Sequence, residues 1–457
     1  MYIRNIYKLF LIFSLNIILI LFLNFLLTWI DYNFIFTNIF VNMVNTLQLN
    51  YFFSLDNISI IFILLTTFLL IICIILNWYL IYKEILFFIL IGLTYVILVN
   101  IFLVSDLFIF FFFFESIVIP MFLIIGLWGS RTRRIKAAYL LLLYTLIGSI
   151  FSIFAFIYLY ICIGSTNYIY ITGINLEIIN QNLLFFLIFI GFSVKIPIIP
   201  LHLWLPEAHV EAPTVGSILL AGILLKLSFY AFIRLIFILL NSWYMYIIFT
   251  IFLIGFYLPS LAALVQLDIK KIIAYSSISH MNFGMFGLFS KNLIGLLGSF
   301  FLMIAHAFVA SALFLSIGIL YERYKTRLLL YYSGLFFLIP VWVFFFFLFI
   351  LANFGLPCTI NFVGEFLVLV SINKINFLFL IFLFIGLILT LGYSLFLYNR
   401  IAHGLIKKTF LRYYSDISRR EFFLFVYFFF FVILFGLCPQ LLIKYFFYIN
   451  YFLYCLI

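Results

Sequence analysis

Residues 191–200 read GFSVKIPIIP and place Lys195 shortly before two prolines in an otherwise apolar stretch. Proline lacks a backbone N–H donor, so it kinks or breaks a helix. Inside a bilayer, a broken helix is tolerated where it lines a water-filled cavity or a binding site. The stretch therefore predicts an interrupted membrane helix with a functional lysine at the break. The alternative is that Lys195 extends along the helix to place its charge at the membrane surface.

The composition of the whole chain predicts a membrane environment for this stretch. Of the 457 residues, 69% are hydrophobic and 8% are charged, whereas a soluble domain carries about 25% charged residues. Apolar runs recur from Tyr7 to Phe447 without the two-residue alternation of a membrane β-barrel. Since one span needs roughly 20 apolar residues, we expect an all-α integral membrane fold with about 13 transmembrane helices. No separate soluble domain is expected within residues 1–457.

The expected spans are 7–30, 55–80, 85–104, 106–128, 137–163, 183–206, 214–237, 244–266, 271–289, 293–320, 336–371, 376–400 and 421–447. The eleventh is expected to be broken, because residues 353–365 read NFGLPCTINFVGE. Two interrupted spans, each with a buried ionisable residue, are typical of an inverted-repeat transporter. We therefore expect N-terminal helices (1–105), a first inverted repeat (106–237), a second (244–400), and a C-terminal amphipathic loop with the last helix (401–457).

The positions of the positive charges predict the sidedness of the loops. Of the 24 Lys and Arg residues, Lys195 and Lys226 fall inside expected spans. Four fall on the side opposite the N-terminus, namely Arg234, Lys291, Lys374 and Lys444, and the other eighteen fall on the N-terminal side. Positively charged loops face the cytoplasm or the matrix. The N-terminus is therefore expected on the inner side, and the net charge of +11 needs no nucleic-acid partner.

Ionisable residues inside the expected spans are candidate functional groups, because each costs roughly 2.5–3.5 kcal/mol at the bilayer centre. Glu115 lies in the middle of an uncharged span, and Lys226 lies about 18 Å along its span, near the centre. Glu365 follows the second break. His280 and His306 lie in different spans, and histidine suits a proton shuttle because it titrates near neutral pH. The simpler interpretation is that these groups are hydrogen-bonded packing residues.

Polar residues nearer the span ends have simpler interpretations. Asp56 and Arg400 suit interface anchors. The residues around the first break match no metal-ligand signature and are expected to cap or hydrate its mouth: His202, Glu207, His209 and Glu211. The five cysteines are scattered, and no phosphate loop or iron–sulfur cysteine set occurs. We therefore expect no cofactor, metal or redox centre in this chain.

Three stretches resemble the antiporter-like membrane subunits of NADH:ubiquinone oxidoreductase (complex I), which are relatives of the large subunits of multisubunit cation/proton antiporters. They are Phe192–Leu227, Ile272–Met281 and Asn361–Phe366. Residues 206–213, PEAHVEAP, favour the chain 4 family over its sister chains. The chain departs from the family in having one expected span fewer before Asp56, and LSFYA at 227–231 where the family is glycine-rich.

The resemblance implies a proton-translocating subunit of the mitochondrial inner membrane, with its N-terminus on the matrix side. It implies NADH, FMN, Fe–S clusters and ubiquinone in other subunits of the complex. Neighbouring antiporter-like subunits and lipids are the implied partners. It further implies a proton-transfer axis in which Glu115 pairs with Lys195, consisting of Glu115, Lys195, Lys226, His280, His306 and Glu365.

Three other functions fit parts of the sequence. A stand-alone or multisubunit cation/proton antiporter would share the fold, although Na⁺ needs clustered oxygen ligands and this axis is rich in Lys and His. A passive scaffold subunit would tolerate apolar replacements of the buried charges, which their insertion cost argues against. A haem protein with two histidine ligands would place a His on each of two helices.

Overall fold

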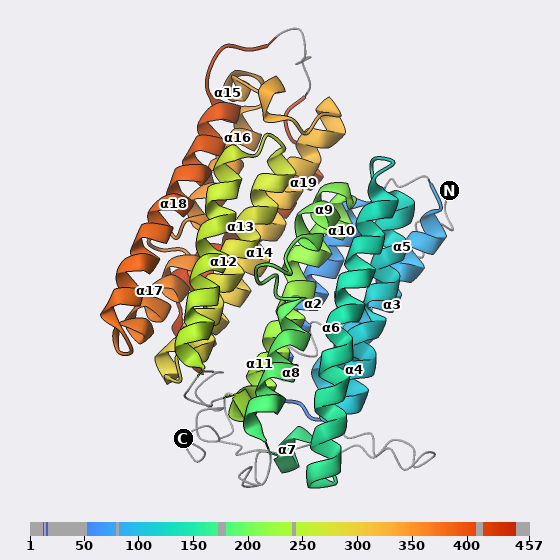
Figure 1. Ribbon diagram of the computed structural model, residues 1–457. Helices are drawn as coiled ribbons and strands as arrows, with labels where there is room; N and C mark the ends of the chain where they lie inside the picture. The colour runs from blue at the N-terminus through green and yellow to red at the C-terminus, as the bar shows by residue number, and fades with distance from the viewer. Residues whose placement is uncertain are drawn as a thin grey trace. The chain divides into compact units, whose positions relative to one another are not determined.

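The computed structural model describes residues 12, 15, 16, 53–78, 82–171, 180–239, 244–407 and 415–444. These residues fold almost entirely as helices (Figure 1). Strand pairing in this part of the chain is limited to isolated bridges such as Phe53 with Val104. The expected span 7–30 lies almost entirely outside the described residues.

The chain forms two compact units. Of the described residues, those up to 195, 230–239 and 444 belong to the first unit, and 196–229 and 244–443 belong to the second. One chain boundary between them falls directly after Lys195, at the first expected helix break.

The first unit is built from helices that precede this break. They are α2 (Asn57–Leu76), α3 (Glu84–Leu103), α4 (Leu107–Ser116), α5 (Val118–Trp128), α6 (Arg134–Ile163), α7 (Tyr168–Ile171) and α8 (Gln181–Ser193), with the end of α11 (Leu225–Leu239). Helices α6 and α8 approach closely because both carry glycine at the contact, as small residues allow in membrane proteins. A Cβ on Gly191 would lie 2.8 Å from the Cβ of Ser152. This contact positions the end of α8 and therefore Lys195.

The second unit is arranged around a central helix, α14 (Leu293–Tyr324). The others are α9 (Trp204–Glu211), α10 (Thr214–Leu219), the π-helical turn η2 (Leu220–Leu224), the start of α11, α12 (Met245–Val265), α13 (Ile269–Phe289), the 3₁₀ turn η3 (Leu329–Tyr331), α15 (Leu335–Leu338), α16 (Pro340–Asn353), α17 (Ile360–Asn373), α18 (Phe377–Ala402) and α19 (Arg419–Leu437). Helices α12, α13 and α14 lie side by side (Figure 1). A Cβ on Gly298 of α14 would lie 2.8 Å from the backbone nitrogen of Val368, so this glycine allows α17 to pack closely.

The described helices confirm an all-α membrane fold. Nine of them are long and apolar enough to cross a membrane, namely Asn57–Leu76, Glu84–Leu103, Leu107–Trp128, Arg134–Ile163, Thr214–Leu235, Met245–Val265, Leu293–Tyr324, Phe377–Ala402 and Arg419–Leu437. Helix α13 coincides with the expected span 271–289 but is not one of these nine, because its serines, His280 and Asn282 lower its mean hydropathy. Helices α8, α16 and α17 are shorter apolar helices on either side of the two expected breaks.

Candidate functional site

The first candidate lysine lies between two helices, in the segment that contains the prolines. Helix α8 stops at Ser193, and α9 begins at Trp204. The residues between them, 194–203, form turns that contain Pro197 and Pro200. Lys195 is the second residue after α8 and is buried. The sequence therefore places a buried ammonium group at the end of a helix, where the backbone ladder is interrupted.

Lys195 forms an ion pair with Glu115 in the first unit. Its Nζ lies 3.0 Å from Oε1 of Glu115. The same Nζ donates a hydrogen bond of 2.6 Å to the carbonyl oxygen of Phe114 and lies 3.3 Å from the centre of the Phe114 ring. The Lys195 side chain is 2% exposed and that of Glu115 is 17% exposed. A carboxylate, a carbonyl and an aromatic face thus stabilise the charged form of this lysine together.

Lys226 contacts a histidine in the second unit. Its Nζ lies 2.7 Å from Nδ1 of His306 on α14, and both side chains are buried. Nζ also donates to the carbonyl oxygen of Ala221 in the π-helical turn η2. A hydrogen bond between two nitrogen bases requires one to donate a hydrogen and the other to accept it. The arrangement is therefore suited to share and pass a single proton.

His280 and Glu365 lie beyond this pair in the same unit. The ring centres of His280 and His306 are 6.1 Å apart, and Nδ1 of His280 is 3.8 Å from Oε1 of Glu365. Neither separation is a direct hydrogen bond. A proton would need a water molecule or a side-chain movement to cross them.

The second break holds Glu365 against a glycine. Helix α16 ends at Asn353 and α17 begins at Ile360. The side-chain amide nitrogen of Asn361, Nδ2, donates to the carbonyl oxygen of Ala352 at 2.8 Å, which ties the two helices together across the break. Gly355 has φ +78°, and a Cβ there would lie 2.3 Å from Oε2 of Glu365. Only glycine leaves room for this backbone turn beside the carboxyl group.

The polar residues that follow the first break differ in exposure. Glu207 pairs with Lys271 at 3.1 Å, and both are partly exposed. Glu211 is buried and lies 3.5 Å from the Arg327 guanidinium. His209 is also buried and stacks on Phe314 with ring centres 4.7 Å apart.

The sequence alone did not identify several buried charged residues. Lys270 and Arg327, which their positions assign to loops, are both buried. Lys270 donates to the carbonyl oxygen of Ala212 at 3.0 Å. The only signal for Arg327 is the apolar run that follows it, Leu328–Leu330. Asp56 and Arg234, 178 positions apart in the chain, form an ion pair in the first unit.

Metal ligation has no geometric basis in the part of the chain that the structure describes. No group of three or more His, Cys, Asp or Glu side chains there could hold a metal ion. The buried ionisable groups instead pair with one another and with backbone carbonyl oxygens. Their chemistry is that of acids and bases.

Known proteins resemble this chain in sequence and in fold. Residues 104–390 match the family described as "NADH:quinone oxidoreductase/Mrp antiporter, TM". The chain is 45% identical to NADH-ubiquinone oxidoreductase chain 4 of Chondrus crispus, over 91% of this chain and 86% of that one. It is also 45% identical to the chain of the same name in Marchantia polymorpha, over 87% of this chain and 81% of that one.

Two solved structures share the fold. A chain of respiratory complex I from Thermus thermophilus with bound NADH has a TM-score of 0.79 and 25% identity, covering 87% of this chain and 84% of that one. A chain of the Mrp complex from Dietzia sp. DQ12-45-1b has a TM-score of 0.85 at 19% identity, covering 97% of this chain and 91% of that one. The second likeness is one of fold alone.

Proposed function

The chain belongs to the family of NADH-ubiquinone oxidoreductase chain 4, and on this premise we propose that it is a proton-translocating membrane-arm subunit of respiratory complex I in the mitochondrial inner membrane. NADH oxidation, FMN, the Fe–S clusters and ubiquinone reduction belong to other subunits. Neighbouring antiporter-like subunits and lipids surround this chain. Redox energy released elsewhere in the complex drives its proton transfer.

The Glu115–Lys195 ion pair is the observation that carries this proposal. Two unit charges about 4 Å apart attract each other by about 4 kcal/mol at an effective dielectric constant of about 20. Lys195 therefore holds its proton while Glu115 is near. Separation of the pair makes the buried ammonium costly and favours release of the proton. A conformational change that opens or closes this ion pair is therefore sufficient to make Lys195 release or bind a proton.

The second group of residues receives and passes on the proton. Lys226 and His306 are already in hydrogen-bond contact, so transfer between them needs no large movement. The steps from His306 to His280 and from His280 to Glu365 go through water or through rotation of the side chains. Glu365 is the terminal proton acceptor of the axis in this chain.

The membrane arrangement that we propose follows the two breaks. Helices α8 and α9 form one discontinuous span, and α16 and α17 form the other, within about 13 spans in all. The regions 106–237 and 244–400 are the two inverted repeats. The basic residues of the loop after α5, including Arg131 and Arg133, support a matrix location for that loop and for the N-terminus.

The decisive variant is Lys226→Ala in the purified complex, reconstituted into lipid vesicles. We expect NADH-driven proton pumping to fall at least roughly tenfold, because a proton-transfer group typically contributes a factor of about 10²–10⁴. Lys271→Gln is the matched control, since this lysine is partly exposed and pairs with Glu207 outside the axis. Full pumping by the Lys226→Ala complex would contradict the proposal.

Native gel electrophoresis of mildly solubilised membranes distinguishes a subunit of complex I from the alternative, a subunit of an independent cation/proton antiporter. We expect the chain to co-migrate with a large band that stains for NADH dehydrogenase activity. Migration in a small assembly without that activity would favour a cation/proton antiporter, and Na⁺-dependent proton exchange would then be measured.

A further inference from the structure

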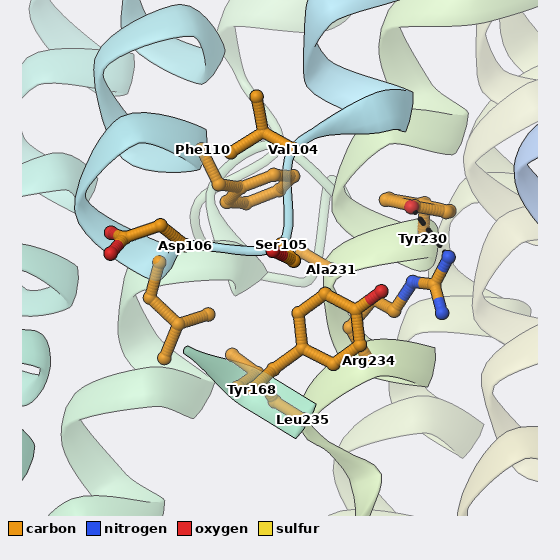
Figure 2. Close-up of a pocket in the computed structure, with 10 residues that line it drawn as sticks. Val104, Ser105, Asp106, Phe110, Tyr168, Tyr230, Ala231, Arg234 and Leu235 are labelled. Atoms are coloured by element: carbon orange, nitrogen blue, oxygen red, sulfur yellow. Dashed lines mark hydrogen bonds between the residues drawn. The ribbon is translucent and has the colours of Figure 1, made fainter. Parts of the chain in front are cut away.

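Polar side chains beside the small cavity at the start of α4, in the first unit, are held by contacts with one another. Arg234 forms an ion pair with Asp56 and donates a hydrogen bond of 2.8 Å to the hydroxyl of Tyr230 (Figure 2). The hydroxyl of Tyr168, which also lines this cavity, lies 2.7 Å from that of Ser54. These contacts are those of a structural network, in which each side chain is fixed by its neighbours.

The second break differs, because four buried polar atoms there have no hydrogen-bond partner among the described residues. They are Nε2 of His280 on α13, Oδ1 of Asn361 and Oε1 of Glu365 on α17, and the hydroxyl oxygen of Tyr393 on α18. None of these residues is more than 5% exposed. Buried polar groups are almost always hydrogen-bonded. Unpartnered groups beside a proton acceptor therefore indicate partners that form in another protonation state.

Tyr393 reaches this set of atoms from α18, which packs against α16 and α17. Its hydroxyl lies near the side chains of Ser276 and Ser279 on α13 and of Asn353 at the end of α16. It also interacts electrostatically with the carboxyl group of Glu365. The phenol thus lies where the helices on both sides of the break meet α13.

The two serines determine how the Tyr393 hydroxyl can be used. The hydroxyl of Ser276 donates to the carbonyl oxygen of Ile273 at 2.8 Å, and that of Ser279 donates to the carbonyl oxygen of Ser276 at 2.8 Å. Each serine has therefore used its only hydrogen and can only accept one from Tyr393. A phenol that gives its hydrogen to a serine keeps its oxygen as an acceptor. The oxygen of Tyr393 is thus left for a donor at the second break.

Glu365 becomes such a donor when it binds a proton. A carboxylate only accepts hydrogen bonds, whereas a protonated carboxyl group carries one O–H donor. Nδ1 of His280, 3.8 Å away, belongs to the group from which the proton arrives, so a hydrogen bond back to it favours return of the proton. Tyr393 offers an acceptor on another helix. A hydrogen bond made only by the neutral carboxyl group favours that form and therefore helps Glu365 to keep the proton.

We propose that Tyr393 is a positioning residue for the last proton-transfer step in this chain, and that its hydroxyl oxygen accepts a hydrogen bond from the protonated carboxyl group of Glu365. The proton leaves a ring nitrogen of His280 and binds a carboxylate oxygen of Glu365, while Tyr393 keeps its own hydrogen and directs it to a serine. The protonated carboxyl group then turns from His280 to Tyr393, which separates the proton from the group that delivered it. This inference rests on the proposed transfer from His280 to Glu365.

The first test is Tyr393→Phe in the purified complex, which keeps the ring and removes only the hydroxyl. We expect NADH-driven proton pumping in lipid vesicles to fall roughly threefold to tenfold, the change in proton affinity that loss of one hydrogen bond produces. Tyr398→Phe is the matched control, because Tyr398 lies later in α18, is partly exposed and packs on Phe347 with ring centres 4.7 Å apart. This control should pump as the wild type does.

Infrared difference spectroscopy of the complex, with and without NADH, supplies a measurement that a packing role would not change. The C=O stretching band that disappears in the Glu365→Gln complex belongs to the protonated carboxyl group of Glu365. In Tyr393→Phe this band should weaken or move to higher frequency. It weakens because fewer of these groups hold a proton, and it moves because those that do donate no hydrogen bond.

Wild-type pumping or an unchanged Glu365 band in the assembled Tyr393→Phe complex would overturn the proposal. If this complex does not assemble, the wild-type band decides. A frequency typical of a carboxylic acid without a hydrogen bond would overturn the proposal, and a lower frequency would support it. Failure of the proposed function would appear differently, as full pumping by the Lys226→Ala complex, whatever the Tyr393 variant does.

Discussion

The two helix breaks carry opposite chemistry and hold it in different ways. At the first, Lys195 makes a short ion pair with Glu115, 3.0 Å long. At the second, Glu365 lies 3.8 Å from His280, which is longer than a hydrogen bond. The first break thus holds a base that is stabilised by a close opposite charge. The second holds an acid with a loose basic neighbour.

This difference assigns different tasks to the two breaks. A lysine in an ion pair is switched by moving the carboxylate away, because the attraction falls as the separation grows. A carboxyl group beside a histidine gains attraction only when a proton makes the histidine positive and leaves the carboxylate negative. We infer that the first break responds to conformational change and that the second responds to the arriving proton.

Removing the charge at the first break is expected to have the largest effect. Glu115→Gln keeps the shape of the side chain and leaves Lys195 buried without its counter-charge. Loss of one partner of a buried ion pair costs about 3–5 kcal/mol, so pumping per NADH oxidised should fall at least roughly tenfold. Glu115→Asp keeps the charge at a greater distance and should retain part of the pumping. Unchanged pumping in the Glu115→Gln variant would show that the ion pair does not control proton transfer at the first break.

The corresponding change at the second break should affect transfer but not stability. Glu365→Gln removes a proton acceptor that makes no direct hydrogen bond to His280. The free energy of unfolding should therefore stay within about 1 kcal/mol of the wild-type value. Proton pumping should fall by roughly tenfold or more, as expected for loss of a proton-transfer group. A large drop in thermal stability would show that Glu365 is a packing residue.

Gly355→Ala tests whether the backbone at the second break positions the carboxyl group. The new methyl group would clash with Glu365 Oε2 and would add about 1–2 kcal/mol of strain at positive φ. Gly164→Ala is the matched control, because Gly164 has the same φ of +78° and nothing within 4 Å. Lower pumping in the Gly355 variant than in the Gly164 variant would isolate the effect on Glu365. Equal behaviour would mean that only backbone strain matters.

The smallest effect is expected from packing at the first break. Gly191→Ala would place a methyl group 2.8 Å from the Cβ of Ser152 and shift α8 from α6. Such overpacking typically costs about 1–3 kcal/mol, which thermal denaturation of the complex would report, with a modest loss of pumping as Lys195 moves. Gly126→Ala is the control, because a Cβ on Gly126 would have no atom within 4 Å. It should leave thermal stability and proton pumping unchanged.

Local sequence was sufficient for the membrane fold and for the ends of helices. Helix α8 ends two residues before Lys195 and the prolines that follow it, and α16 ends at the start of the Asn-Phe-Gly-Leu-Pro run, so both ends lie near the residues from which we expected a break. Pairing between distant residues was not predictable in the same way. The contact of Lys226 with His306 joins positions 80 apart, and no spacing rule connects them. The pairing of Glu115 with Lys195 was expected only from the resemblance to a family.

Asp56 and Arg234 show a further reason why contacts between distant residues could not be predicted from the sequence. Each lies near the end of an expected span, where charged residues are common as interface anchors. Only the tertiary structure shows that they pair with each other. A charge near a span end looks the same in sequence whether lipid headgroups, water or another side chain surrounds it.

The π-helical turn at Leu220–Leu224 has a consequence for which changes in chain length this protein tolerates. A π-helical turn holds one residue more than the hydrogen-bonded turn of an α-helix. Deletion of one of these five residues would therefore let a regular α-helix form and would leave the direction of Lys226 relative to α10 nearly unchanged. Deletion of one residue from the regular helix on either side of the turn would instead rotate Lys226 by about 100°, away from His306, although the hydropathy of the span would be kept. The π-helical turn is therefore the part of this span in which the loss of one residue is tolerated.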